Sequence, residues 1–340
     1  MSVSSTVKLL QSPDGTTIFA EATGDPKNVH VVLVSGLSLS GCVFDGMCAD
    51  QRLFDALYIV RYDLRGHGRS GKPDTAEAYE SKMFAADFKT VMDAFKLHRP
   101  VFVGWSLGAA VATDVVTHLP PHTLSGIIYL AGVPDTTTVD VMAAPALKAA
   151  LPGLMSADSV ASFTASADIF VDACFSHPDA VPYAVRCVHA GHRLSADIMH
   201  LSLTRPMALE NLWKAGKDGL PLVCVQGTDD GHRAGSAKSV DEIMHPHFTN
   251  YEMIWLEGRG HALHAECPNK IVQILIKYSN KFAGKANSVE DPRPTRPTST
   301  DIDQVGRAAQ CGHAAASEPV TEFAPGAEAQ YDPNSVHGFS

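Results

Sequence analysis

The sequence predicts an α/β fold in which helices cover both faces of a mostly parallel sheet. Short β-branched or apolar runs recur along the chain, and each is followed by a longer stretch of helical period. Strands that alternate with helices pair in parallel, because each crossover returns the chain to the same end of the sheet. The expected parallel strands are residues 30–34, 57–62, 100–104, 126–130, 222–226 and 251–256.

A β-hairpin is expected before the first of these strands. Residues 7–11 and 16–20 flank the turn at 12–15, whose Asp-Gly pair is typical of a tight hairpin turn. Farther along, residues 81–97 show apolar side chains at a spacing of 3.6 residues, which predicts a helix with one face in the core. These side chains are Met83, Phe84, Phe88, Val91, Met92 and Phe95.

A long insertion is expected after the strand at 126–130. Roughly ninety residues separate this strand from the next, whereas an ordinary crossover needs about a dozen. The sequence therefore predicts a helical cap at 134–215 and a core formed by 1–133 and 216–283. One helical face of the cap, expected to pack on the core, carries Phe163, Ala167, Phe170 and Cys174. Prolines are expected to separate its segments at Pro152, Pro178 and Pro182.

Composition and net charge exclude several classes of protein. The chain has 340 residues, 45% hydrophobic and 19% charged, and a net charge of -10, so no basic excess is available to neutralise nucleic-acid phosphates. No apolar run resembles a signal peptide or a membrane span, which predicts a cytoplasmic protein. The seven scattered cysteines lack a C-x-x-C pair and indicate neither a disulfide framework nor a zinc site. Residues 284–340 have the composition of a disordered tail.

Ser106 is the predicted nucleophile. It is the centre of a G-x-S-x-G motif at 104–108, between the expected strand 100–104 and a helix-patterned stretch at 109–118. The glycines let strand and helix approach without Cβ clashes, and the tight turn thrusts the hydroxyl outward. A near match at 36–40 lacks the last glycine.

His261 is the predicted general base. A serine hydroxyl needs a base to take its proton, and His261 follows the expected strand 251–256 through a loop that contains Gly258 and Gly260. His264 is an alternative, and the two histidines leave open a metal pair. No nearby carboxylate constellation completes such a site, so we predict no metal.

The predicted acid that orients the imidazole is Asp230. It follows the expected strand 222–226, and the order Ser106, Asp230, His261 is the chain order that accompanies this elbow. Asp229 is adjacent, where a turn-forming role is also open. Asp135, after the strand at 126–130, is a rival.

Two backbone amides are expected to bind the oxyanion. One is that of Leu107, the residue after the nucleophile, and the other is that of Leu37, in the loop after the strand at 30–34. Both amides are inferred from their position.

From residue 31 to about 281 the chain resembles α/β-hydrolase fold enzymes of the capped, monodomain class. The resemblance implies a cofactor-free site under the cap, and it favours Asp230 over Asp229, because the acid is usually the second Asp of the G-x-x-D block. Ser35 stands where relatives commonly have His. The turn at 61–70 looks structural in relatives, so Arg65 and His67 receive no catalytic role. The blocks that carry the likeness are 34–37, 61–70, 104–108, 227–230 and 260–261.

The expected activity is hydrolysis of carboxylic esters of small to medium, largely apolar substrates. Serine at the elbow favours an acyl-enzyme over the alkyl-enzyme chemistry that an Asp would suggest. A similar triad also serves carbon-carbon bond hydrolases, lactonases and perhydrolases, and the motifs do not separate these. A ligand receptor or scaffold on the same fold is the alternative of another class.

Overall fold

The computed structural model describes residues 5–156, 159–191, 194–233 and 238–284. The described residues form one eight-stranded sheet with the strand order β1-β2-β4-β3-β5-β6-β7-β8. β1 and β2 pair antiparallel with their neighbours, and the other strands are parallel. The strands are β1 (Thr6–Gln11), β2 (Thr17–Thr23), β3 (Val29–Val34), β4 (Leu57–Tyr62), β5 (Val101–Trp105), β6 (Gly126–Leu130), β7 (Leu222–Gly227) and β8 (Tyr251–Leu256).

The parallel strands lie where the sequence predicts them, to within one residue at each end. The expected hairpin is also present, although β2 continues to Thr23 because it pairs with β4 on its other side. Alternate residues of the buried strands enter two separate cores. In β3, Val32 and Val34 belong to one core and Val31 and Leu33 to the other. Such strands are apolar on both faces because helices cover both faces.

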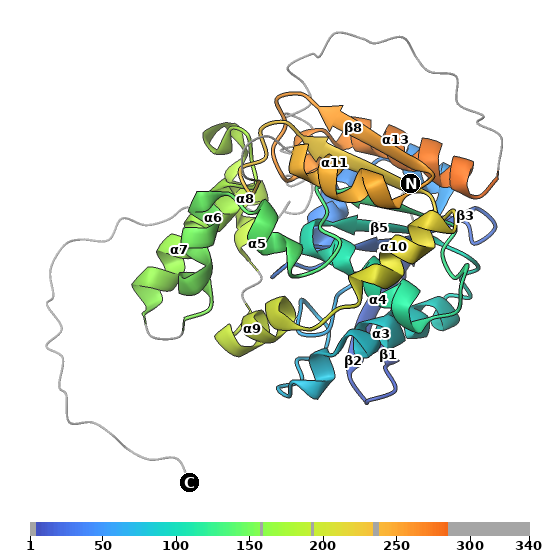
Figure 1. Ribbon diagram of the computed structural model, residues 1–340, viewed down its shortest axis with the longest axis horizontal. Helices are drawn as coiled ribbons and strands as arrows, with labels where there is room; N and C mark the ends of the chain where they lie inside the picture. Colours follow the sequence, from blue (N-terminus) through green and yellow to red (C-terminus); the bar gives the residue numbers. More distant parts are fainter. Residues whose placement is uncertain (1–4, 157–158, 192–193, 234–237, 285–340) are drawn as a thin grey trace, which may run out of the picture.

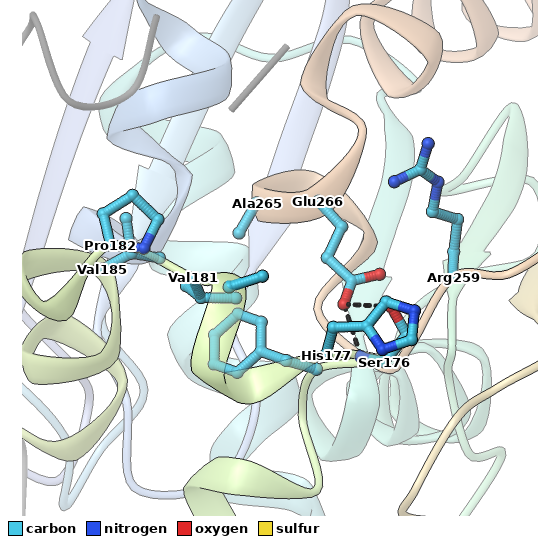
Figure 2. Close-up of a pocket in the computed structure, with 10 residues that line it drawn as sticks. Ser176, His177, Val181, Pro182, Val185, Arg259, Ala265 and Glu266 are labelled. Carbon is cyan, nitrogen blue, oxygen red and sulfur yellow. Dashed lines mark hydrogen bonds between the residues drawn. The ribbon is translucent and has the colours of Figure 1, made fainter. Parts of the chain in front are cut away.

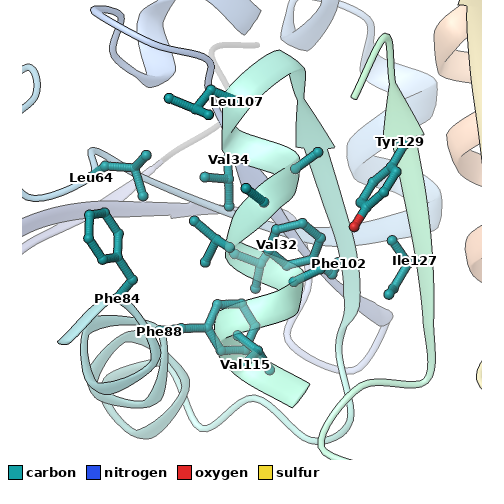
Figure 3. Close-up of a cluster of buried hydrophobic side chains, with 14 of the residues drawn as sticks. Val32, Val34, Leu64, Phe84, Phe88, Phe102, Leu107, Val115, Ile127 and Tyr129 are labelled. Carbon is teal, nitrogen blue, oxygen red and sulfur yellow. The ribbon is translucent and has the colours of Figure 1, made fainter. Parts of the chain in front are cut away.

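Helices α3 (Ser81–Ala94), α4 (Val111–His118) and α10 (Leu209–Lys217) contribute to the first core. Figure 3 shows part of this core, including Phe84 and Phe88 of α3 and Val115 of α4. The second core contains side chains from α1 (Asp45–Cys48), α2 (Gln51–Ala56), α12 (Leu263–Glu266) and α13 (Pro268–Phe282). α11 (Lys238–Met244) contributes buried side chains to the first core. Figure 1 shows α10 and α4 on one side of the sheet. Helix-covered faces leave the ends of the strands as the place for a site.

Two helices differ from the sequence prediction. α3 ends at Ala94, three residues early, because the chain turns left-handed at Lys96 (φ +55°), and the Leu97 amide closes the end on the Met92 carbonyl. The helix expected at 109–118 begins earlier, as a 3-10 turn at Ser106–Ala110, and continues as α4.

Of the six α-helices described between β6 and β7, the five that precede α10 gather on the left in Figure 1. α6 packs on α7, and α7 packs on α8. Pro152 was expected between segments, but it lies inside α6. Proline has no amide hydrogen, so the backbone carbonyl of Lys148 lacks its helical hydrogen bond, and Lys148 is an exposed residue. Cys174 lies beyond the end of α7 rather than on its face. The helices are α5 (Thr138–Met142), α6 (Pro145–Leu154), α7 (Val160–Asp172), α8 (Tyr183–Ala190) and α9 (Ala196–Thr204).

The tail predicted at 284–340 lies outside the described residues except for its first position. Within the described part of the chain, no helix combines the length and the apolar character that crossing a bilayer requires.

Candidate active site

Ser106 lies at the sharp turn between β5 and α4. Its φ is +54°, in the left-handed region that residues other than glycine rarely adopt. Neighbouring glycines permit the turn. A Cβ on Gly104 would lie 2.3 Å from the Cα of Ala109, and a Cβ on Gly108 would lie 2.2 Å from the carbonyl oxygen of Ser35. The position of the serine therefore depends on backbone contacts that a larger residue would prevent.

Asp230 and His261 are brought together at the ends of neighbouring strands. Asp230 follows β7 and His261 follows β8, and these strands pair in parallel. Both side chains are buried, with His261 Nδ1 2.8 Å from Asp230 Oδ2. The two loops pass so closely that a Cβ on Gly227 would lie 2.1 Å from the carbonyl oxygen of Arg259. A residue without a side chain at 227 thus allows the pair to form.

The Asp230 carboxylate has further partners. Besides the contact with His261, Oδ2 accepts a hydrogen bond from Gln226 Nε2 at 2.6 Å, and Oδ1 accepts one from the His232 amide at 2.9 Å. Burial alone would raise the pKa of Asp230, but the charge and hydrogen bond of His261, with the charge of Arg233, hold that pKa well below its usual range. The carboxylate therefore stays ionised and can stabilise a protonated His261.

Gln226, His232 and Arg233 were not singled out from the sequence. The His232 ring stacks on His261 with centroids 4.2 Å apart, and its Nε2 lies 2.8 Å from the carbonyl oxygen of Phe170. Burial lowers the pKa of His232 to about 3, so the ring is neutral at neutral pH. The available signals were the polar residue near the end of the apolar strand 222–227 and the polar pair that follows Asp230 after one glycine.

The rival acids lie elsewhere. Asp229 is exposed, and its Oδ1 accepts a hydrogen bond from Thr228 Oγ1 at 2.9 Å. Asp135 is buried, and its Oδ1 accepts one from the Thr138 amide at 2.8 Å. Among the described contacts, the aspartate that meets His261 is Asp230.

His264 is a buried ring in the core. Its centroid lies 4.5 Å from that of Trp105 and 5.0 Å from that of Phe44. Burial first, and the nearby His189 and His261 next, lower the pKa of His264 well below its usual value. Over the residues that the structure describes, no group of three His, Cys, Asp or Glu side chains could hold a metal ion.

Hydrogen bonds hold the loop that carries His261 on two sides. Trp105, next to Ser106, donates a hydrogen bond from Nε1 to the carbonyl oxygen of His261 at 2.9 Å. The Glu266 carboxylate accepts one from the Gly260 amide at 2.6 Å and one from the Ser176 amide at 2.6 Å. Figure 2 shows Glu266 beside Ser176 at the edge of a second pocket. These contacts join the His261 loop to β5 and to the segment after α7.

Ser106 and His261 line the same pocket. Asp230 occupies Nδ1 of His261, and Nε2 has no hydrogen-bond partner among the described residues. Nε2 is therefore the nitrogen left to exchange a proton. Much of the lining is apolar and comes from both the core and the inserted helices: Leu37, Leu107, Val133, Leu147, Leu151 and Phe170.

Leu37 and Leu107, the expected oxyanion residues, both line this pocket. The loop after β3 passes beside Ser106, since a Cβ on Gly36 would lie 3.0 Å from Ser106 Cβ. Ser35, which stands where relatives commonly have His, donates from Oγ to the carbonyl oxygen of Leu39 at 3.3 Å. The loop thus keeps an internal hydrogen bond next to Ser106.

Arg65 and His67 belong to the turn after β4. The buried Arg65 guanidinium donates to both carboxylate oxygens of Asp87 at 2.7 Å, and His67 Nδ1 lies 2.9 Å from the Arg65 carbonyl oxygen. These contacts support the structural role expected for the turn.

Parts of the chain are similar in sequence to curated proteins. The Rhodomycin D methylesterase DnrP of Streptomyces peucetius is 28% identical over 123 residues, which cover 36% of this chain and 41% of that protein. The Probable oxidoreductase EphD of Mycobacterium tuberculosis is 40% identical over 96 residues, which cover 28% of this chain and 16% of that protein. The matched segments thus span less than half the length of these curated relatives.

The fold is similar to that of a solved esterase, and most of the chain matches a family model. The esterase RhEst1 from Rhodococcus has a TM-score of 0.72 at 21% identity, over 81% of this chain and 99% of that one, a likeness that shows the fold. The model of the Alpha/beta hydrolase family matches residues 31–274. Since this match covers well over half of the sequence, the chain belongs to the Alpha/beta hydrolase family.

Proposed function

We propose that this protein is a serine hydrolase that cleaves carboxylic esters through an acyl-enzyme intermediate. The observation that carries the proposal is the pocket shared by Ser106 and His261, in which His261 is paired through Nδ1 with Asp230 at 2.8 Å. Nucleophile, base and acid in this arrangement are the parts that acyl transfer needs.

In the proposed reaction, Ser106 Oγ attacks the ester carbonyl and His261 Nε2 takes its proton. Asp230 stabilises the imidazolium, and the amides of Leu37 and Leu107 bind the oxyanion of the tetrahedral intermediate. His261 then gives the proton to the departing alcohol, which leaves an acyl-enzyme. A water molecule, activated by His261, releases the acid and restores Ser106.

The substrate is proposed to be a small to medium ester with a largely apolar body. Leu147 and Leu151 of α6 and Phe170 of α7 complete the pocket above the elbow, so we propose that the segment 134–215 serves as a cap. The curated relative that is a methylesterase agrees with ester chemistry.

The first test is labelling of the intact protein with a fluorophosphonate probe, read by mass spectrometry. We expect one label in the wild type and none in Ser106→Ala, since the probe reacts with an activated serine. In parallel, p-nitrophenyl esters of increasing acyl length measure turnover and rank the acyl groups that the pocket accepts.

Either outcome decides the class. A single label that is lost in Ser106→Ala, together with ester turnover, supports the serine esterase. A folded wild-type protein without a label and without turnover contradicts it and favours the ligand receptor or scaffold.

A further inference from the structure

Arg233 brings a buried guanidinium to the pocket that contains Ser106. The residue is 8% exposed and lines the pocket together with His232 and His261. Among the described lining residues there is no carboxylate, and the pKa of His232 is lowered to about 3, so that ring is neutral. Arg233 therefore brings a permanent positive charge to a pocket lined by no described carboxylate.

The contacts of Arg233 leave part of its guanidinium unused. Nη2 donates to the carbonyl oxygens of Ala131 at 2.6 Å and Gly132 at 3.3 Å. Nε is buried without a hydrogen-bond partner in the described part of the chain, and Nη1 donates to no described residue. The hydrogen bonds to the turn at 131–132 thus account for one of the three guanidinium nitrogens, Nη2.

Asp230 balances this charge incompletely. Its Oδ2 lies 3.8 Å from Arg233 Nε, beyond hydrogen-bond distance, and the same oxygen already contacts His261 and Gln226. Burial lowers the pKa of Arg233 in spite of the attraction of Asp230. A buried cation with unused donors is costly unless another group pairs with it.

The proposed reaction increases the need for an anion. When His261 takes the serine proton, two cations share Asp230, because His261 and Arg233 both approach Oδ2. Their repulsion opposes the transition state. A negative group on the substrate, placed at Arg233, would offset that repulsion and satisfy the unused donors.

We propose that Arg233 determines specificity by binding a carboxylate of the substrate, so that the preferred substrates are esters that carry a carboxylate on an apolar body. This inference rests on the proposed ester hydrolysis at Ser106. It narrows the substrate class from apolar esters to anionic ones.

The test compares matched anionic and neutral esters with the purified full chain. Half-esters of p-nitrophenol with succinate, glutarate and adipate are paired with p-nitrophenyl butanoate, pentanoate and hexanoate. The pair 4-acetoxybenzoate and phenyl acetate places the carboxylate on the leaving group instead. The readout is the ratio of kcat/KM, anionic over neutral, after subtraction of the uncatalysed rates.

We expect this ratio to be about 10 or more for at least one pair in the wild type, and to fall by about 10-fold or more in Arg233→Met, since a charge-assisted pair is lost. Arg233→Lys keeps the charge and should retain part of the preference. The control is Arg259→Met, which removes a cation of the second pocket in Figure 2 and should leave the ratio unchanged.

A wild-type ratio at or below one for every pair overturns the proposal, and so does a ratio that Arg233→Met leaves unchanged. Should Arg233→Met not fold, calorimetry of Ser106→Ala decides instead, with about 10-fold tighter binding of the preferred anionic ester over its neutral partner expected. Equal or weaker binding overturns the proposal. Hydrolysis of neutral esters without an anionic preference refutes the role of Arg233 alone, whereas absence of turnover and of Ser106 labelling refutes the proposed function.

Discussion

At the residue scale, the role of Asp230 comes from its neighbours. Asp229 has the same side chain one position earlier, but it is exposed and contacts Thr228. Asp230 is enclosed, and Gln226 and His261 both approach its Oδ2. The lowered pKa of Asp230 means that it remains a carboxylate at mildly acidic pH, so loss of activity there does not arise from its protonation.

Asp230→Asn should lower kcat by about 10⁴-fold, because the amide cannot stabilise the imidazolium or select the tautomer that leaves Nε2 free. Ester turnover and the rate of fluorophosphonate labelling measure the effect. The matched control is Asp229→Asn, which should change kcat by less than about 2-fold, since surface substitutions away from a site are nearly neutral. A larger loss in Asp229→Asn than in Asp230→Asn would reverse the assignment of the acid.

At the element scale, the turn from β5 to α4 requires close backbone packing. A Cβ on Gly108 would lie 2.2 Å from the carbonyl oxygen of Ser35 and 2.7 Å from that of Val34. Both oxygens belong to backbone at the end of β3, which lies in the middle of the sheet and cannot shift without disturbing its pairing. The elbow and the loop of Leu37 are therefore one packed unit.

Gly108→Ala should lower the free energy of unfolding by about 2 kcal/mol or more, through overpacking. It should also slow fluorophosphonate labelling of Ser106. Gly46→Ala is the matched control, because a Cβ at this helical position has nothing within 4 Å and alanine favours helix by about 1 kcal/mol. Urea unfolding at pH 7.5 measures both variants, and equal midpoints would show that the elbow tolerates a side chain.

At the scale of the whole molecule, several histidines are buried in the neutral form. Burial lowers the pKa of His67 to about 4, of His189 to about 4 and of His232 to about 3. In the unfolded chain a histidine has a pKa of about 6.5. Between these values the unfolded state binds more protons, so stability is full above about pH 6.5 and is lost as the pH falls toward 4.

Urea unfolding at pH 7.5, 6.5 and 5.5 should show this loss, with each such histidine contributing about 1 kcal/mol per pH unit within the window. Asp87 and Asp114 act in the opposite direction, because burial raises their pKa. Comparison with His189→Phe isolates one histidine: the pH dependence should become shallower by about one proton. The same slope in both proteins would mean that His189 does not contribute.

The sequence by itself determined the strands, and it predicted the nucleophile and the chain order of the proposed triad. Apolar β-branched runs form strands wherever they are covered on both faces, and the motif at 104–108 carries its own local requirement for glycine. Local pattern was insufficient at the end of α3, where the left-handed turn at Lys96 intervenes, and at Pro152, which lies inside α6.

Only the tertiary structure decided which side chains meet. The contact of Asp230 with His261 spans 31 positions, that of Arg233 with Ala131 spans 102, and that of Trp105 with His261 spans 156. Periodicity carries no information over such separations, because the packing of strands and loops sets these distances. The sequence did not single out Arg233 and His232. Folding places the loops after the neighbouring strands β7 and β8 at the same end of the sheet, and both residues line the pocket there.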